Sequence, residues 1–194
     1  MIFFAESGHL YPENLARTET FKDQLKIHFR PIKPSDEDMM RRLFYHFSDE
    51  SKYLRYFARL SIMPHKEMQK YVNIDYEKIF SIVAILQKDR TERIIAEARY
   101  AYYDRIDAYE MAFIVDEEYH GIGLGTYMVR YIMEIAAARN IPKLPAYVHN
   151  DNARMAWLFE HAAIRPDIAL GEHEKEYTFY LNLDVALNED MNNY

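Results

Sequence analysis

The chain has 194 residues, of which 49% are hydrophobic and 28% charged, as is ordinary for one soluble globular domain with a substantial core. It contains no cysteine, which excludes disulfides, thiolate metal ligands and a cysteine nucleophile and suits a reducing compartment. The formal net charge of −7 argues against nucleic-acid binding, which needs clustered Lys and Arg, and suits a cationic partner. Apolar runs are strand-sized and no basic residue precedes the first apolar patch. We therefore expect a cytoplasmic protein with no secretory signal and no membrane span.

The N-terminal part predicts an extension, a strand and three helices. Residues 1–25 lack sustained periodicity and are expected either to wrap the domain or to link it to another one. Alternation over 26–30 predicts a strand that ends at Pro31. Capping residues and a proline predict helices that begin at Ser35, Ser48 and Pro64. The expected division of the chain is an N-terminal extension or linker (1–25), a folded domain (26–185) and a C-terminal tail (186–194).

The pattern becomes rich in β-formers after the third helix. Strands are expected at 79–86, 93–103, 109–115 and 143–148, with two more around the polar turn 171–174. Residues 104–107 fit a hairpin turn, and helices are expected at 124–139 and 152–163. This order predicts an α+β fold, with a mostly antiparallel sheet of about six to seven strands and helices on both faces.

Three of the five glycines are Gly121, Gly123 and Gly125, placed where an apolar strand gives way to a strongly helical segment. Glycine allows positive φ and a close approach of the backbone to a ligand. The free N–H groups of the following helix and its dipole then form an anion site that suits a pyrophosphate. The alternative is a glycine-rich turn with no ligand.

Three phosphate loops can be compared with this segment. A Walker loop ends in Gly-Lys-Ser/Thr, and no lysine follows here. A dinucleotide fingerprint has Gly-x-Gly-x-x-Gly and an acid that closes the next strand. The chain has Gly-x-Gly-x-Gly, and its next strand ends in Tyr147-Val148-His149. An acyl-CoA loop remains.

Residues 120–125, His-Gly-Ile-Gly-Leu-Gly, resemble the Gln/Arg-x-x-Gly-x-Gly/Ala loop of the GNAT N-acetyltransferase superfamily except at the first position. Residues 152–159, Asn-Ala-Arg-Met-Ala-Trp-Leu-Phe, are similar to the family's Asn-x-x-Ala/Met-x-x-Leu-Tyr/Phe segment. The resemblance implies a GNAT acetyltransferase domain over 26–185, with strands splayed at an acetyl-CoA site, acetyl-CoA as co-substrate and no metal. The binding residues that it implies are Phe113, Ile114, Val115, His120, Gly121, Ile122, Gly123, Leu124, Gly125, Thr126 and Asn152. An Asn152 that only caps a helix is the alternative, and the two roles are compatible.

Residues 30–37, 48–57 and 72–76 resemble one subgroup more closely: the GNAT modules fused to bacterial acyl-CoA synthetases or acetyl-CoA hydrolase/transferases. Its synthetase-linked members acetylate protein lysines. The resemblance thus implies an acetyl-CoA-dependent N-acetyltransferase with a protein lysine as acceptor. It also implies fusion or association with an acyl-CoA-metabolising enzyme. The alternative is a non-catalytic acyl-CoA-binding regulatory module that controls a partner enzyme.

Acetyl transfer needs an uncharged amine, whereas a lysine amine has a pKa of roughly 10 and must give up a proton. In the lysine acetyltransferase modules the base is a glutamate in the strand before the loop, and Glu110 matches that position. Glu110 at a solvated strand start is the alternative. In the family the thiolate leaving group often takes its proton from a tyrosine where this chain has Phe159, so no general acid is named.

The loop also departs from the family pattern. His120 replaces the usual Gln or Arg, Ile122 stands where many relatives have Arg, and acids at 116–118 have the wrong sign for an anion. We therefore expect weaker, pH-sensitive CoA binding that improves when His120 is protonated. The histidines are scattered and no His-Glu-x-x-His occurs, so no metal site is expected. Arg55, Tyr56 and Arg59 either line the acceptor cleft or form a solvated helix face.

Overall fold

The computed structural model describes residues 10–88 and 91–181, so the expected tail 186–194 lies outside the described residues. The strands are β1 (Arg17–Thr20), β2 (Lys26–Pro31), β3 (Ile79–Lys88), β4 (Thr91–Tyr103), β5 (Ala108–Val115), β6 (Lys143–His149), β7 (Asp167–Leu170) and β8 (Glu174–Tyr180). The α-helices are α1 (Glu37–His46), α2 (Asp49–Tyr56), α3 (His65–Val72), α4 (Leu124–Ala138) and α5 (Ala153–Glu160). Short 3-10 helices are η1 (Glu13–Leu15), η2 (Lys22–Gln24), η3 (Pro34–Asp36) and η4 (Glu117–Tyr119).

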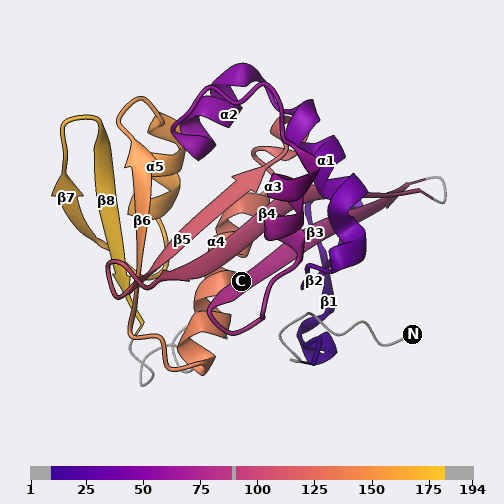
Figure 1. The fold of residues 1–194 in the computed structure, drawn as a ribbon, viewed down its shortest axis with the longest axis horizontal. Coiled ribbons are helices and arrows are strands. Elements are labelled where there is room, and N and C mark those ends of the chain that lie inside the picture. The colour runs from indigo at the N-terminus through magenta and orange to yellow at the C-terminus, as the bar shows by residue number, and fades with distance from the viewer. Residues whose placement is uncertain (1–9, 89–90, 182–194) are drawn as a thin grey trace.

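The strands form two antiparallel sheets rather than one. The first has five strands in the order β1-β2-β3-β4-β5, and the second has three in the order β6-β8-β7. β5 and β6 lie next to each other in space but belong to different sheets, so each is an edge strand (Figure 1). The expected α+β class, with mostly antiparallel strands and helices on both faces, is confirmed.

The chain enters the sheet earlier than expected, because β1 pairs with β2 from Arg17 to Thr20. This strand is short and polar and carries no alternating apolar signal. Tertiary contacts hold it instead: the Arg17 guanidinium lies 3.4 Å from the centre of the Tyr131 ring and pairs with Glu134 on α4. Tyr11 also donates a hydrogen bond to the Pro31 carbonyl at 2.9 Å. Residues 10–25 therefore wrap the domain.

Two of the three expected helix starts agree with the structure. The Ser48 hydroxyl accepts a hydrogen bond from the Ser51 backbone N–H, and Pro64 directly precedes α3. The expectation that Ser35 caps α1 is wrong, because Ser35 lies in η3 and Asp36 holds the N-cap position. The Asp36 carboxylate is buried and accepts two hydrogen bonds of 2.7 Å from Arg30, which joins β2 to this helix start.

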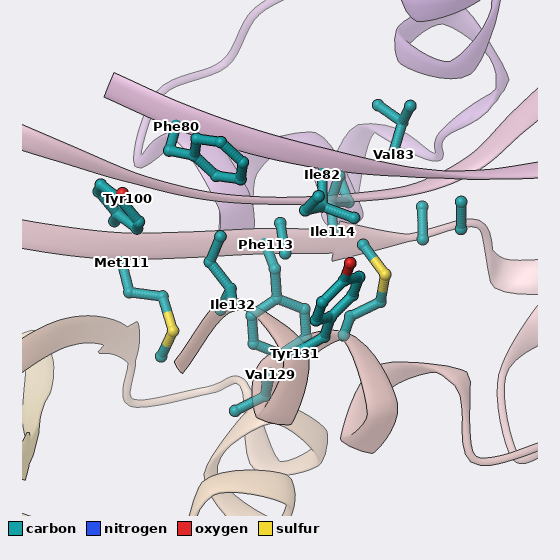
Figure 2. Packing of buried hydrophobic residues seen from close by; sticks show 14 of the residues in the cluster. Phe80, Ile82, Val83, Tyr100, Met111, Phe113, Ile114, Val129, Tyr131 and Ile132 are labelled. Carbon is teal, nitrogen blue, oxygen red and sulfur yellow. The ribbon is translucent and has the colours of Figure 1, made fainter. Parts of the chain in front are cut away.

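The core lies on both faces of the large sheet, under α1 and α3 on one side and α4 on the other (Figure 1). Figure 2 shows Met111 and Phe113 of β5 pointing toward Val129 and Ile132 of α4, with Val83 on the opposite side of the sheet. This alternation leaves Glu110 and Ala112 on the face opposite α4. In the described part of the chain, no helix has the length and apolar character to cross a bilayer.

Candidate active site

A cleft of about 1480 Å³ opens where the two sheets separate. Its walls come from α2, the ends of β4 and β5, the loop before α4, and the facing parts of β6 and α5. β5 pairs with β4 along one edge, and no described strand pairs with its other edge. Phe113, Ile114 and Val115 contribute to this wall, so their backbone groups can pair with an extended ligand as an added strand does.

The glycine loop ends one side of the cleft. Gly121 has φ of 76° and Gly123 has φ of 88°, both in the left-handed region that favours glycine. Gly123 is the N-cap residue of α4, and no described side chain caps this helix start. The N–H groups of the first turn therefore remain available to an anion, and the helix dipole favours negative charge there.

Gly125 has a different role from the other two glycines. It lies within α4, and a Cβ at this position would come 2.8 Å from Leu158 Cδ1 of α5. The missing side chain lets the first turn of α4 pack closely against α5. Gly121 and Gly123 thus allow the backbone conformation of the loop, and Gly125 allows close packing of α4 against α5.

Gly123→Ala is expected to lower the Tm and weaken acetyl-CoA binding. A left-handed residue with a Cβ costs about 1–2 kcal/mol. Because the added Cβ would meet nothing within 4 Å, the loss comes from the backbone alone. Thermal unfolding and a binding titration measure the two effects. Gly123→Asn is the matched variant and should lose less, because Asn tolerates this conformation. An unchanged Tm and affinity in Gly123→Ala would contradict this role.

His120 connects the loop to β5 and α5. Its Nε2 lies 2.9 Å from the Val115 carbonyl oxygen, and its Nδ1 accepts a hydrogen bond from the Arg154 guanidinium. Arginine can only donate, so Nδ1 carries no proton and Nε2–H donates to Val115. Both ring nitrogens are thus in use. The expected gain in CoA binding on protonation of His120 stays a prediction, and a proton on Nδ1 would compete with the Arg154 contact.

Arg154 is one of the cleft residues that sequence reasoning missed. It is exposed, lines the cleft and lies in the first turn of α5, where the helix dipole disfavours a cation. Its guanidinium therefore supplies the positive charge that Ile122 does not. The sequence shows an arginine in the first turn of this helix. It does not show that the arginine lies next to the glycine loop, because 34 residues separate Arg154 from His120. Only the tertiary fold brings the two together.

The remaining residues of the predicted binding set divide between cleft and core. Thr126 and Asn152 line the cleft. Asn152 also caps α5, with its Oδ1 3.1 Å from the Met155 backbone nitrogen. Leu124 is completely buried in the core and Ile122 packs against it. Neither side chain belongs to the cleft wall, so these two residues can offer only backbone groups to a ligand.

Glu110 lies half-buried in the cleft wall, on the face of the sheet opposite α4. Burial raises the pKa of its carboxyl group, and the nearby carboxylates of Glu174 and Glu176 raise it further. A base with a raised pKa takes a proton from an ammonium group more readily than an ordinary glutamate. The position and the direction of this shift both suit a general base.

Phe159 is buried in an aromatic cluster on the α5 side of the cleft. Its ring centre lies 5.6 Å from that of Phe113, 5.3 Å from Tyr177 and 5.1 Å from Phe179. The Tyr177 hydroxyl in this cluster donates to Glu160. Phe159 therefore packs the cleft wall and offers no proton to a leaving group.

The three acids before the loop are held by other parts of the protein. Glu117 accepts hydrogen bonds from the hydroxyls of Ser48, at 2.7 Å, and Ser51, at 2.6 Å, and these bonds lower its pKa. Asp116 is buried and pairs with Arg93, which also contacts Glu118. Arg93 therefore balances one of the three negative charges, and the contacts attach the loop to α2 and β4.

One group of possible metal ligands occurs in the described residues. His46, Asp116 and Glu118 each offer an atom, and these atoms lie within 4.8 Å of one another. However, the Arg93 guanidinium lies 2.5 Å from an Asp116 oxygen and 3.1 Å from a Glu118 oxygen. The Arg93 guanidinium therefore already pairs with the carboxylates of Asp116 and Glu118, and the group is an ion-pair cluster.

Comparison with known proteins identifies the family. The model of the acetyltransferase (GNAT) family matches residues 37–163. A curated acetyltransferase of Pseudomonas aeruginosa is 22% identical over 118 residues. The match covers 61% of this chain and 63% of that relative, so the chain spans less than two thirds of its length.

Two solved structures share the fold. The GNAT domain of S. lividans PAT has a TM-score of 0.79 at 23% identity and covers 88% of this chain and 99% of its own. RimL, a ribosomal-protein alpha-N-protein acetyltransferase solved with coenzyme A, has a TM-score of 0.63 at 14% identity, over 81% of this chain and 96% of its own. At these identities the matches show the fold. The family model covers well over half of the residues, and the chain belongs to the acetyltransferase (GNAT) family.

Proposed function

We propose that this protein is an acetyl-CoA-dependent N-acetyltransferase that acetylates a lysine side chain of a protein by direct transfer in a ternary complex. One observation carries the proposal: a single cleft joins the glycine loop and Arg154 at one end to Glu110, with its raised pKa, at the other. The first end suits the anionic part of acetyl-CoA, and the second suits an ammonium group. A protein lysine also agrees with the subgroup resemblance and with the net charge of −7.

The reaction needs one base and a donor for the developing oxyanion. Glu110 accepts a proton from the lysine ammonium group, and the free amine nitrogen then bonds to the thioester carbonyl carbon. Backbone N–H groups at the open edge of β5 stabilise the negative charge that develops on the carbonyl oxygen. The carbon–sulfur bond then breaks, the nitrogen releases its second proton to solvent, and the amide forms. The CoA thiolate takes a proton from solvent, because Phe159 has none to give, and Glu110 returns its proton to solvent.

The test is acetyl transfer by the purified protein. With acetyl-CoA and a lysine-containing protein, including a candidate acyl-CoA synthetase, we expect thiol release and one acetyl-lysine per thiol by mass spectrometry. A polyamine and a peptide whose only amine is its N-terminus are the comparison acceptors. Transfer to one of these and not to lysine would reject the lysine assignment while keeping the N-acetyltransferase activity.

A second candidate is a non-catalytic acyl-CoA-binding module that regulates a partner enzyme. Phe159 in place of a tyrosine favours it, because the cleft then lacks the hydroxyl that protonates the thiolate in relatives. This candidate predicts acetyl-CoA binding with no thiol release for any amine. It also predicts that Glu110→Gln changes nothing measurable at the binding step.

A further inference from the structure

Two arginines share one carboxylate beneath the acceptor end of the cleft. Arg99 Nε lies 2.6 Å from Glu97 Oε1, and Arg55 Nη2 lies 3.9 Å from Glu97 Oε2. The Ser81 hydroxyl also donates to Glu97 at 2.7 Å, so the Glu97 carboxylate has three partners. Arg55 and Arg99, which we call the arginine pair, carry two positive charges, and Glu97 between them carries one negative charge.

Both arginines are partly buried and open to the cleft, and Glu97 is buried. The side chains of Arg55, Arg99 and Glu97 are 14%, 12% and 2% exposed, and both arginines line the cleft. Arg99 is held at its other end by the Tyr71 carbonyl, 2.9 Å away. Arg55 is held less completely, because its buried Nε has no hydrogen-bond partner in the described structure. A buried excess positive charge with an unsatisfied donor is costly unless an anion completes it.

The sheet register places Arg99 on the same face of the sheet as Glu110. Arg99 pairs with Ala112, and Glu110 pairs with Ala101, so Arg99 and Glu110 are diagonal neighbours on one face, with Cα atoms roughly 7–8 Å apart. The pKa of Tyr103 responds both to Glu110 and to the two guanidiniums, so these charges lie around one side chain. Burial raises the pKa of its hydroxyl, and Glu110 raises it further. The guanidiniums of Arg99 and Arg55 oppose that rise.

Aromatic rings form walls around the arginine pair. The Arg55 guanidinium carbon lies 5.1 Å from the Tyr56 ring centre, and that of Arg99 lies 4.5 Å from the Tyr71 ring centre. These contacts fix the planes of both guanidiniums, as planar recognition of a carboxylate requires. Of the three residues for which a cleft wall and a solvated helix face were the alternatives, Arg55 and Tyr56 line the cleft, whereas Arg59 is exposed and does not.

We propose that Arg55 and Arg99 form a subsite that binds a carboxylate of the acceptor, next to the amine that Glu110 deprotonates. The inference rests on the proposed acetyltransferase function and specifies its acceptor as an amine with a carboxylate nearby. The carboxylate balances the net positive charge of the two arginines and Glu97. It comes either from an Asp or Glu side chain beside a target lysine or from a free amino acid.

The test compares matched acceptors. One pair is a lysine peptide with Asp beside the lysine and the same peptide with Asn, and the other is free lysine and lysinamide. For the wild-type protein we expect kcat/KM to be roughly 10- to 100-fold higher for the carboxylate member of one pair. Preference in the peptide pair identifies an acidic protein segment, and preference in the amino acid pair identifies a small acceptor.

Three variants attribute the preference to the subsite. Arg55→Met should remove the preference, so that the two members of each pair are acetylated with equal kcat/KM. Arg55→Lys should retain part of it, because charge without the planar fork remains. Arg59→Met is the matched control and should behave as wild type. Acetylation of both members of each pair at equal rates would overturn the subsite and leave the proposed function intact.

A binding measurement separates this inference from the activity. In the acetyl-CoA complex, glutarate should shift the NMR signal of the Arg55 Nε–H in the wild-type protein, and Arg55→Met should not bind glutarate. This result with no acetylation of any amine would support the subsite and reject the transferase. No shift at millimolar glutarate, together with equal rates for matched acceptors, would reject the subsite.

Discussion

Replacing Glu110 by Gln is expected to lower kcat for acetyl transfer by at least about 100-fold, because an amide cannot accept the proton of the attacking ammonium group. The affinity for acetyl-CoA should stay unchanged, since Glu110 lies at the other end of the cleft from the glycine loop. Steady-state kinetics and a fluorescence titration measure the two quantities separately. Unchanged kcat would exclude Glu110 as the base, and a large loss of affinity would indicate a general distortion of the cleft.

Folding provides the control for this variant. Burial raises the pKa of Glu110 above its value in the unfolded chain, so its contribution to stability is present at low pH and is lost as the pH rises through the raised pKa. At neutral pH the ionised carboxylate therefore costs stability. The neutral amide removes that cost, and we expect the Tm of Glu110→Gln to be equal to the wild-type value or higher.

The pH dependence of the acetyl-transfer rate should also reflect the raised pKa of Glu110. Activity is expected to fall on the acid side as Glu110 becomes protonated, at a pH above the ordinary glutamate range of roughly 4–5. Glu174→Gln removes a neighbouring charge that raises this pKa, so the acid limb should move to lower pH. An acid limb that does not move would show that another group controls it.

Replacing Arg154 by Met is expected to raise the Kd for acetyl-CoA roughly 10- to 100-fold, the usual range for losing a hydrogen bond to a charged group. The guanidinium lies next to His120 and the glycine loop, where it supplements the uncapped first turn of α4. Trp157 is the single tryptophan of the chain. It lines the cleft on the same helix, so its fluorescence can report binding directly.

Arg130→Met is the matched control, because Arg130 is an exposed cation of α4 that pairs with Glu134 and does not line the cleft. It should leave the Kd unchanged. Raised salt should weaken binding in the wild-type protein more than in Arg154→Met. Equal Kd values for Arg154→Met and the wild type would remove Arg154 from the phosphate site.

The sequence determined the elements whose signals are local. Alternation in β5, the glycine loop and the apolar stripe of α4 predicted a strand, a turn and a helix in this order, and the structure has all three there. Glu110 and Asn152 could be found because family motifs fix their places relative to those elements. These features depend on residues close in the chain, where the side-chain period and capping chemistry decide the conformation.

Only the tertiary structure decided the features that depend on distant residues. β1 has no apolar pattern and is held by contacts of Arg17 with α4. Arg154 reaches His120 across 34 residues, and Arg55 of α2 approaches Glu97 of β4, which also pairs with Arg99. Contacts between charged residues that are far apart in the chain leave no periodic pattern in the sequence, because the partners meet only in the folded protein.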